Sequence, residues 1–162
     1  MKRAGFRLRE GLPENFDHVP KKSIIVLDDL MDESKDGPQV TALFTKRAHH
    51  RSFFVIVTMQ NLFNQSKESR DRALNVQYLV LFKNPRDGGQ ITTLNSQMFR
   101  RRKGYLEACF ENATKDSPNS YLFLDLHQHS SKQTRVRTRV LKRKRSMMTY
   151  IYKQTFNKKG CL

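Results

Sequence analysis

The sequence has few of the residues on which extracellular and membrane proteins depend. Its two cysteines, Cys109 and Cys161, are too few and too scattered for a disulfide framework or a cysteine-based zinc site. Its apolar stretches fall well short of the ~20 residues that span a bilayer. Residues Met1–Arg7 are charged but lack the apolar core of a secretory signal. We therefore expect an intracellular protein that is not secreted and has no membrane span.

Acidic residues are also scarce in this chain. The 15 Asp and Glu residues stand against 31 Lys and Arg residues, which gives a formal net charge of +16. Such an excess of positive charge is typical of proteins that bind nucleic acid. With 162 residues, the chain is one domain or a piece of one, and it is long enough to bury a hydrophobic core.

One apolar run ends in two acidic residues. Residues 23–27 lead directly into Asp28 and Asp29, and their continuous apolar character predicts a strand that is buried on both faces, as in a parallel sheet. The two acids then fall at the carboxyl end of the strand, where open α/β sheets bind ligands. A carboxylate pair in this place can hold Mg²⁺ and activate a water molecule. The alternative is that an Asp caps the following helix.

Three further apolar strands are predicted, at residues 52–58, 76–82 and 121–126. Helical spacing is found at residues 39–49 and 66–74, and residues 90–114 fit one long helix or two short ones. This alternation favours an α/β fold with a mainly parallel sheet. Each strand is followed by polar residues, which in a parallel sheet would share one edge: Asp28 and Asp29; Thr58, Gln60 and Asn61; Asn84 and Arg86; Asp125.

The C-terminal part of the chain is strongly basic. Residues 132–145 hold eight Lys or Arg residues. Residues 135–140 alternate with period two, which predicts an edge strand with one arginine face, and the alternative is a solvated basic tail. A second basic run lies at residues 100–103. The candidate nucleic-acid-binding residues are Arg100, Arg101, Arg102, Lys103, Arg135, Arg137, Arg139, Lys142 and Arg143.

Several motifs follow one another in a characteristic order. They are Ile24-Ile25-Val26-Leu27-Asp28-Asp29-Leu30-Met31, Leu43-Phe44-Thr45 with His49-His50-Arg51, Gln60-Asn61-Leu62-Phe63, Glu68-Ser69-Arg70 and Phe82-Lys83-Asn84-Pro85-Arg86-Asp87. In these motifs the chain resembles the DNA-packaging ATPases of Polinton (Maverick) elements, adintoviruses and related large DNA viruses, within the FtsK/HerA superfamily. The resemblance runs from about residue 6 to about residue 152. It implies a RecA-like (ASCE) P-loop NTPase core with a mainly parallel sheet and flanking helices.

The resemblance also implies a role for individual residues. Asp28 would bind the Mg²⁺ of Mg-ATP, and Asp29, the second acid of the Walker B strand, would polarise the attacking water. Gln60 would sense the γ-phosphate, with Asn61 beside it. Arg70 would be an arginine finger that reaches the nucleotide of a neighbouring subunit, which can be worth ~10³–10⁵ in rate.

The sequence departs from this family at the phosphate-binding loop. None of its seven glycines is followed by Lys-Ser or Lys-Thr, so the motif G-x-x-x-x-G-K-[ST] is absent. We therefore expect the C-terminal portion of such an ATPase, incomplete at its N-terminal side and inactive alone. It would comprise an approach segment at residues 1–22, the core from the Walker B strand onward at residues 23–126, and a basic extension with the edge strand at residues 127–162.

The function that this resemblance implies is ATP-driven translocation of double-stranded DNA, which packages a viral or transposon genome into capsids. Its partners would be double-stranded DNA, viral capsid or portal-vertex proteins and further copies of the chain in a ring, in the host nucleus or the virion. Two alternatives stay open. One is a non-catalytic nucleic-acid-binding remnant of such an ATPase. The other is a nuclease that holds two Mg²⁺ ions with Asp28, Asp29 and Asp125.

Overall fold

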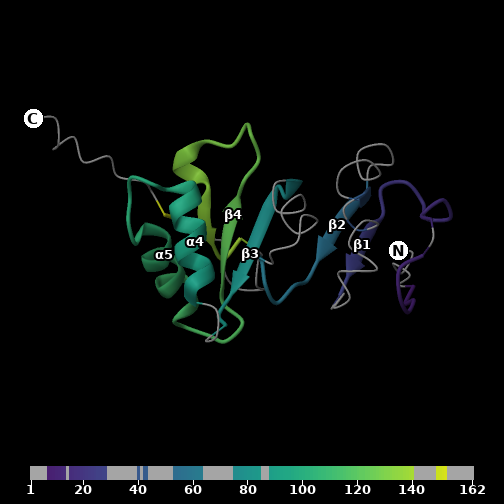
Figure 1. Ribbon diagram of the computed structural model, residues 1–162, viewed down its shortest axis with the longest axis horizontal. Coiled ribbons are helices and arrows are strands. Elements are labelled where there is room, and N and C mark those ends of the chain that lie inside the picture. Colours follow the sequence, from purple (N-terminus) through teal and green to yellow (C-terminus); the bar gives the residue numbers. More distant parts are fainter. Residues whose placement is uncertain are drawn as a thin grey trace, which may run out of the picture. The chain divides into compact units, whose positions relative to one another are not determined.

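The chain divides into two compact units, residues 1–75 and residues 76–162. The computed structural model describes residues 7–13, 15–28, 40, 42–43, 53–63, 75–84, 88–140 and 149–152 (Figure 1). Each unit has a sheet of its own. The predicted segments 1–22, 23–126 and 127–162 follow other boundaries and remain predictions.

The sheet of the first unit is a pair of parallel strands. Strand β1 (Ile24–Leu27) lies beside β2 (Phe54–Val57), with Ile24 opposite Phe54 and Leu27 opposite Val57. Both segments are β-branched or aromatic over most of their length, which suits a pleated strand. The two predicted strands are thus confirmed, and the pair is parallel as expected.

Only one face of this pair is buried. Successive side chains point to opposite faces of a strand, and the side chains on the inner face pack with a small core. That core and the residues packed against it include Phe16, Val40, Leu43, Phe53, Ile25, Leu27, Val55 and Val57. On the outer face, Ile24 is 65% exposed and Phe54 is 70% exposed. The expectation that the run at residues 23–27 is buried on both faces is therefore wrong for this unit.

The sheet of the second unit is antiparallel. Its strands are β3 (Tyr78–Phe82), β4 (Tyr121–Asp125), β5 (Val136–Thr138) and β6 (Tyr150–Ile151), and they lie in that order. Each neighbouring pair is antiparallel. A short 3₁₀ helix, η2 (Lys132–Thr134), precedes β5. Because β5 pairs with β4 on one side and β6 on the other, it is not the edge strand that the alternating sequence predicted.

Two helices connect β3 to β4, and they decide the direction of β4. Helix α4 (Gly88–Met98) and helix α5 (Tyr105–Thr114) are separated by a turn in which Gly104 has φ of 72°. This is the two-helix alternative for residues 90–114. The pair returns the chain to the end of β3, since Phe82 lies opposite Tyr121, the first residue of β4. The polar residues after β3 and β4 therefore lie at opposite ends of the sheet and not at one shared edge.

The helices cover one face of this sheet. In Figure 1, α4 and α5 lie together beside β3 and β4 on the same side. The buried side chains of the helices and the sheet include Ile91, Leu94, Leu106, Cys109, Ala113, Leu122, Leu124 and Val136. The leucines of β3 and β4 face this core, because Leu79 lies opposite Leu124 and Leu81 opposite Leu122.

A cluster of ionisable groups stabilises α5 against the C-terminal strand and makes the unit sensitive to alkali. The Tyr105 hydroxyl donates to the Tyr152 carbonyl at 2.9 Å, and the Tyr152 hydroxyl donates to Asn112 Oδ1 at 2.9 Å. Burial raises the pKa of the Cys109 thiol from 9.0 to about 11, and burial also raises the pKa of Tyr105 and Tyr152. The folded state therefore favours the neutral forms.

We expect the contribution of this cluster to the stability of the unit to be constant below pH 9 and to fall as the pH rises from 9 towards 11. The reason is that the unfolded chain releases these protons at lower pH than the folded chain does. Urea denaturation at a series of pH values measures the effect. In a Cys109→Ala, Tyr105→Phe variant the decrease should be smaller. An unchanged decrease in that variant would contradict the assignment to this cluster.

Candidate nucleotide site and basic surfaces

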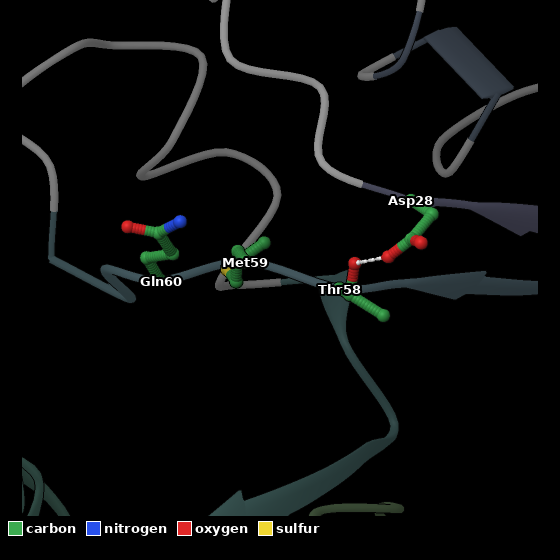
Figure 2. Close-up of a pocket in the computed structure, with 4 residues that line it drawn as sticks. All are labelled: Asp28, Thr58, Met59 and Gln60. Carbon is green, nitrogen blue, oxygen red and sulfur yellow. Dashed lines mark hydrogen bonds between the residues drawn. The ribbon is translucent and has the colours of Figure 1, made fainter. Parts of the chain in front are cut away.

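Two polar side chains meet at the carboxyl edge of the parallel pair. Asp28 directly follows β1 and Thr58 directly follows β2. The Thr58 amide donates to the Leu27 carbonyl at 3.0 Å, which extends the ladder of backbone hydrogen bonds by one residue. The Thr58 hydroxyl in turn donates to Asp28 Oδ1. Figure 2 shows the two side chains pointing toward each other from neighbouring strands.

An open cavity of about 360 Å³ lies at this edge. It is lined by Asp28, Thr58, Met59 and Gln60 (Figure 2). The carboxylate, the hydroxyl and the amide carbonyl are the hard oxygen ligands that Mg²⁺ prefers, and Asp28 is exposed to solvent. No Lys, Arg or Gly is among the lining residues that the structure describes. These four residues suit a magnesium ion, and they include no cationic or glycine-rich cradle for phosphate groups.

The other residues predicted for the nucleotide site are placed as follows. Asn61 is exposed, and its Oδ1 accepts a hydrogen bond from the Phe63 amide at 2.9 Å, which stabilises a local turn. It does not line the cavity. Asp29 and Arg70 lie outside the residues that the structure describes. Their roles remain predictions.

The basic run Arg100–Lys103 forms the turn between α4 and α5, which we call the basic turn. The Phe99 amide donates to the Asn95 carbonyl at 2.7 Å, and the Arg102 amide donates to the Phe99 carbonyl at 2.8 Å. Arg100, Arg101 and Lys103 are exposed. The Arg102 guanidinium lies 5.8 Å from the centre of the Tyr105 ring, within the range of a cation–π contact.

A buried amide holds the basic turn in place. Asn95 is 4% exposed. Its Nδ2 donates to the Arg102 carbonyl at 3.0 Å, and its Oδ1 accepts from the Leu106 amide at 2.9 Å. One side chain thus satisfies a carbonyl of the turn and an otherwise unpaired amide in the first turn of α5. The turn presents its charges from a fixed backbone.

Two of the three arginines predicted around the basic strand are paired within the chain. Arg137 binds Asp125 at 2.9 Å, with 25% and 9% of the two side chains exposed. Arg139 binds Asp116 at 2.9 Å, and both of these side chains are 52% exposed. Arg135 Nη2 contacts the Ser130 carbonyl at 3.5 Å. Lys142 and Arg143 lie outside the described residues.

The third acid of the nuclease alternative has partners of its own. Asp125 accepts hydrogen bonds from Arg137 and from the His127 amide, the latter at 3.2 Å. It belongs to the second unit, whereas Asp28 belongs to the first. Across the parts of the chain that the structure describes, no group of three or more His, Cys, Asp or Glu side chains could hold a metal ion.

Two features of the structure were not predicted from the sequence. The first is Asn95, which holds the basic turn. The second is the arrangement of leucine and aromatic residues along β3. An Asn within a helical segment next to four basic residues is the only local signal for the first. The signal for the second is that the leucines of β3 occupy one set of alternating positions, while Tyr78, Val80 and Phe82 occupy the other.

Comparison of the chain with profiles of known protein families, with curated proteins and with solved structures finds no match in any of the three. Among the described residues, none of the helices is long and apolar enough to cross a membrane.

Proposed function

We propose that the chain is part of an ATP-driven motor that moves double-stranded DNA and packages a viral or transposon genome into capsids. The observation that carries this proposal is the position of Asp28, Thr58 and Gln60 at the carboxyl edge of a parallel strand pair, around one open cavity. Ligands of open α/β sheets bind at such edges. The motif order described for the sequence gives each residue its proposed role.

In this proposal Asp28 binds Mg²⁺ and the Thr58 hydroxyl orients the Asp28 carboxylate. Gln60 senses the γ-phosphate and Asp29 polarises the attacking water. Arg70 acts as an arginine finger on the nucleotide of a neighbouring subunit. When bound, Mg²⁺ would neutralise phosphate charge. Because the sequence has no motif G-x-x-x-x-G-K-[ST], the proposal requires that residues other than a Walker A loop hold the phosphates.

The exposed outer face of β1 and β2 also supports this proposal. Parallel sheets are found almost only with both faces covered by helices, yet Val26 is 59% exposed and Ile56 is 50% exposed. The flanking helices of the proposed RecA-like core would bury these side chains. The basic surface fits as well, because a motor that follows phosphates without reading bases needs Lys and Arg.

A second candidate function is nucleic-acid binding without catalysis. It is favoured by the absence of the motif G-x-x-x-x-G-K-[ST] from the sequence, together with a formal charge of +16. In this case the basic turn would still contact phosphates, and the cavity at Asp28 would have no nucleotide to bind.

Binding of a fluorescent ATP analogue by the full chain separates the two functions. In the presence of Mg²⁺, we expect Asp28→Asn to weaken binding roughly 10- to 100-fold, the equivalent of one lost charge-assisted contact. Removal of Mg²⁺ with a chelator should abolish the difference between the variant and the natural chain, because Asp28 acts through the metal.

The matched control is Glu10→Gln, which removes an exposed carboxylate of the same unit and should leave ATP affinity unchanged. Absence of ATP binding, with DNA binding retained, would refute the ATPase proposal for this chain and support the second candidate. Cleavage of plasmid DNA that depends on Mg²⁺ and on Asp28 would instead support the nuclease alternative.

A further inference from the structure

The uncovered face of the β3–β6 sheet is rich in aromatic side chains. We call it the aromatic face and define it as Tyr78, Val80, Phe82, Tyr121, Phe123, Asp125, Arg137 and Ile151, which share one side of the sheet by register. The helices α4 and α5 cover the opposite side, where Leu122 and Leu124 are fully buried (Figure 1). One sheet therefore has a leucine side for its core and an aromatic side that is partly exposed.

The aromatic rings on this face form two contacting pairs. The ring centres of Tyr78 and Phe123 lie 5.6 Å apart, and those of Phe82 and Tyr121 lie 5.9 Å apart. Tyr78 is 51% exposed and Phe82 is 57% exposed. The pairing fixes rings from neighbouring strands against one another while leaving much of their surface accessible to solvent.

An arginine lies beside these rings and is paired with a carboxylate. Arg137 lies opposite Phe123 on one side and Ile151 on the other. Its guanidinium is held by Asp125 at 2.9 Å, and its Nε also donates to the Thr134 carbonyl. This ion pair is close to neutral, so the attraction of the face for a polyanion comes from the net charge of the chain as a whole. The chain as a whole carries a formal net charge of +16, and this charge attracts polyanions.

We propose that the aromatic face binds single-stranded nucleic acid, with bases stacked on Tyr78 and Phe82. A sheet that is covered by helices on one side and displays aromatic and arginine side chains on the other meets the chemical needs of such a strand. Unpaired bases stack on aromatic rings while cationic side chains contact the phosphates. This binding goes beyond the translocation of duplex DNA, because a base inside a duplex has no free face to offer.

Fluorescence anisotropy of a labelled oligonucleotide of about 10 nucleotides, which matches the site size of known single-strand-binding surfaces, tests the proposal. The probes are one DNA strand, the RNA strand of the same sequence, and an abasic DNA strand that keeps the phosphates but lacks the bases. We expect at least one intact strand to bind more tightly than the abasic strand. Comparison of the DNA and RNA affinities shows whether the face prefers deoxyribose or ribose.

Phe82→Ala should weaken binding of that intact strand roughly 5- to 100-fold, the range found for the loss of one stacked base. The matched control is Phe54→Ala, which removes an exposed phenylalanine of the same kind from β2 in the first unit. This control should leave single-strand affinity unchanged. Binding of the abasic strand should be nearly the same in Phe82→Ala and in the natural chain.

The sequence contains no tryptophan, so Phe82→Trp introduces a single reporter that keeps an aromatic ring on the face. We expect this variant to retain single-strand binding and its emission to be quenched by the intact strand but not by the abasic strand. Equal binding of intact and abasic strands, or equal effects of Phe82→Ala and Phe54→Ala, would overturn the proposal. Both of these outcomes are also expected if the aromatic face instead binds another protein.

The proposals can fail independently. Asp28→Asn reports on the nucleotide site, while Phe82→Ala reports on the aromatic face, and the two residues belong to different units of the chain. Loss of ATP binding with intact stacking would leave the single-strand proposal in place. Duplex DNA competes only for phosphate contacts, so it should displace the intact strand less effectively from the natural chain than from Phe82→Ala.

Discussion

Leu122→Ala is expected to lower the free energy of unfolding of the β3–β6 unit by about 2–5 kcal/mol. Leu122 is 0% exposed, and it lies on β4 opposite Leu81 of β3. Truncation removes apolar atoms from the core and leaves a cavity whose walls close only in part, because strand pairing fixes the surrounding backbone. Urea denaturation of the full chain measures the loss.

The control for Leu122→Ala is Val80→Ala on the neighbouring strand. Val80 is 45% exposed on the aromatic face, so its truncation should change the stability by less than about 1 kcal/mol. Amide hydrogen exchange assigns the change to a unit, since β4 should lose protection while β1 and β2 keep theirs. Equal effects of the two substitutions would show that the leucine side of the sheet is not the core.

The strands of this chain could be predicted from the sequence because their apolar runs are short and bounded by polar residues. The runs at residues 23–27 and 52–58 contain β1 and β2, and those at residues 76–82 and 121–126 contain β3 and β4. Val40 and Leu43, which lie within the segment of helical spacing at residues 39–49, are buried. Local side-chain chemistry is enough to identify such segments.

Strand direction could not be predicted in the same way, because it depends on the connection and not on the strand. A single long helix at residues 90–114 would have carried the chain across the sheet and made β4 parallel to β3. The turn at residues 99–104 gives two helices instead, and β4 begins beside the end of β3. The connection between the strands, with two helices in place of one, thus separates a parallel prediction from an antiparallel sheet.

The burial of the run at residues 23–27 was overestimated for a related reason. An apolar run does not reveal whether one or both faces are covered, since that depends on what packs against it. In β3, the separation of leucines from aromatic residues distinguishes the two faces, although a hydrophobicity scale gives both kinds of residue similar weight. For β1 and β2, Ile24, Val26, Phe54 and Ile56 offer no such difference from their buried neighbours.

The candidate site was predicted in part. Asp28 and Gln60 line one cavity, as the strand-end argument predicted, whereas Asn61 is engaged in its own turn. The contact of Thr58 with Asp28 depends on the register of β1 and β2, which places Leu27 opposite Val57. Register is a tertiary property, and the sequence of either strand alone does not specify it.

The largest functional effect is expected at the basic turn. Replacing Arg100, Arg101 and Lys103 together with glutamine should lower the affinity for duplex DNA on the order of 100-fold at low salt. Each of these exposed side chains can neutralise one phosphate, and each such contact releases condensed counterions. The slope of log affinity against log salt should therefore become shallower by roughly 3. Arg102 is kept because it packs on Tyr105.

The control carries the same loss of charge at dispersed positions. Lys21, Lys83 and Lys115 are exposed in the structure, and their joint replacement with glutamine changes the net charge equally. If Asn95 makes the turn a preorganised phosphate contact, the dispersed variant should keep most of the salt slope of the natural chain. An equal reduction of the slope in both variants would mean that only the total charge matters. Duplex binding would then have no defined place on this protein, and the basic turn would lose its role in the proposed motor.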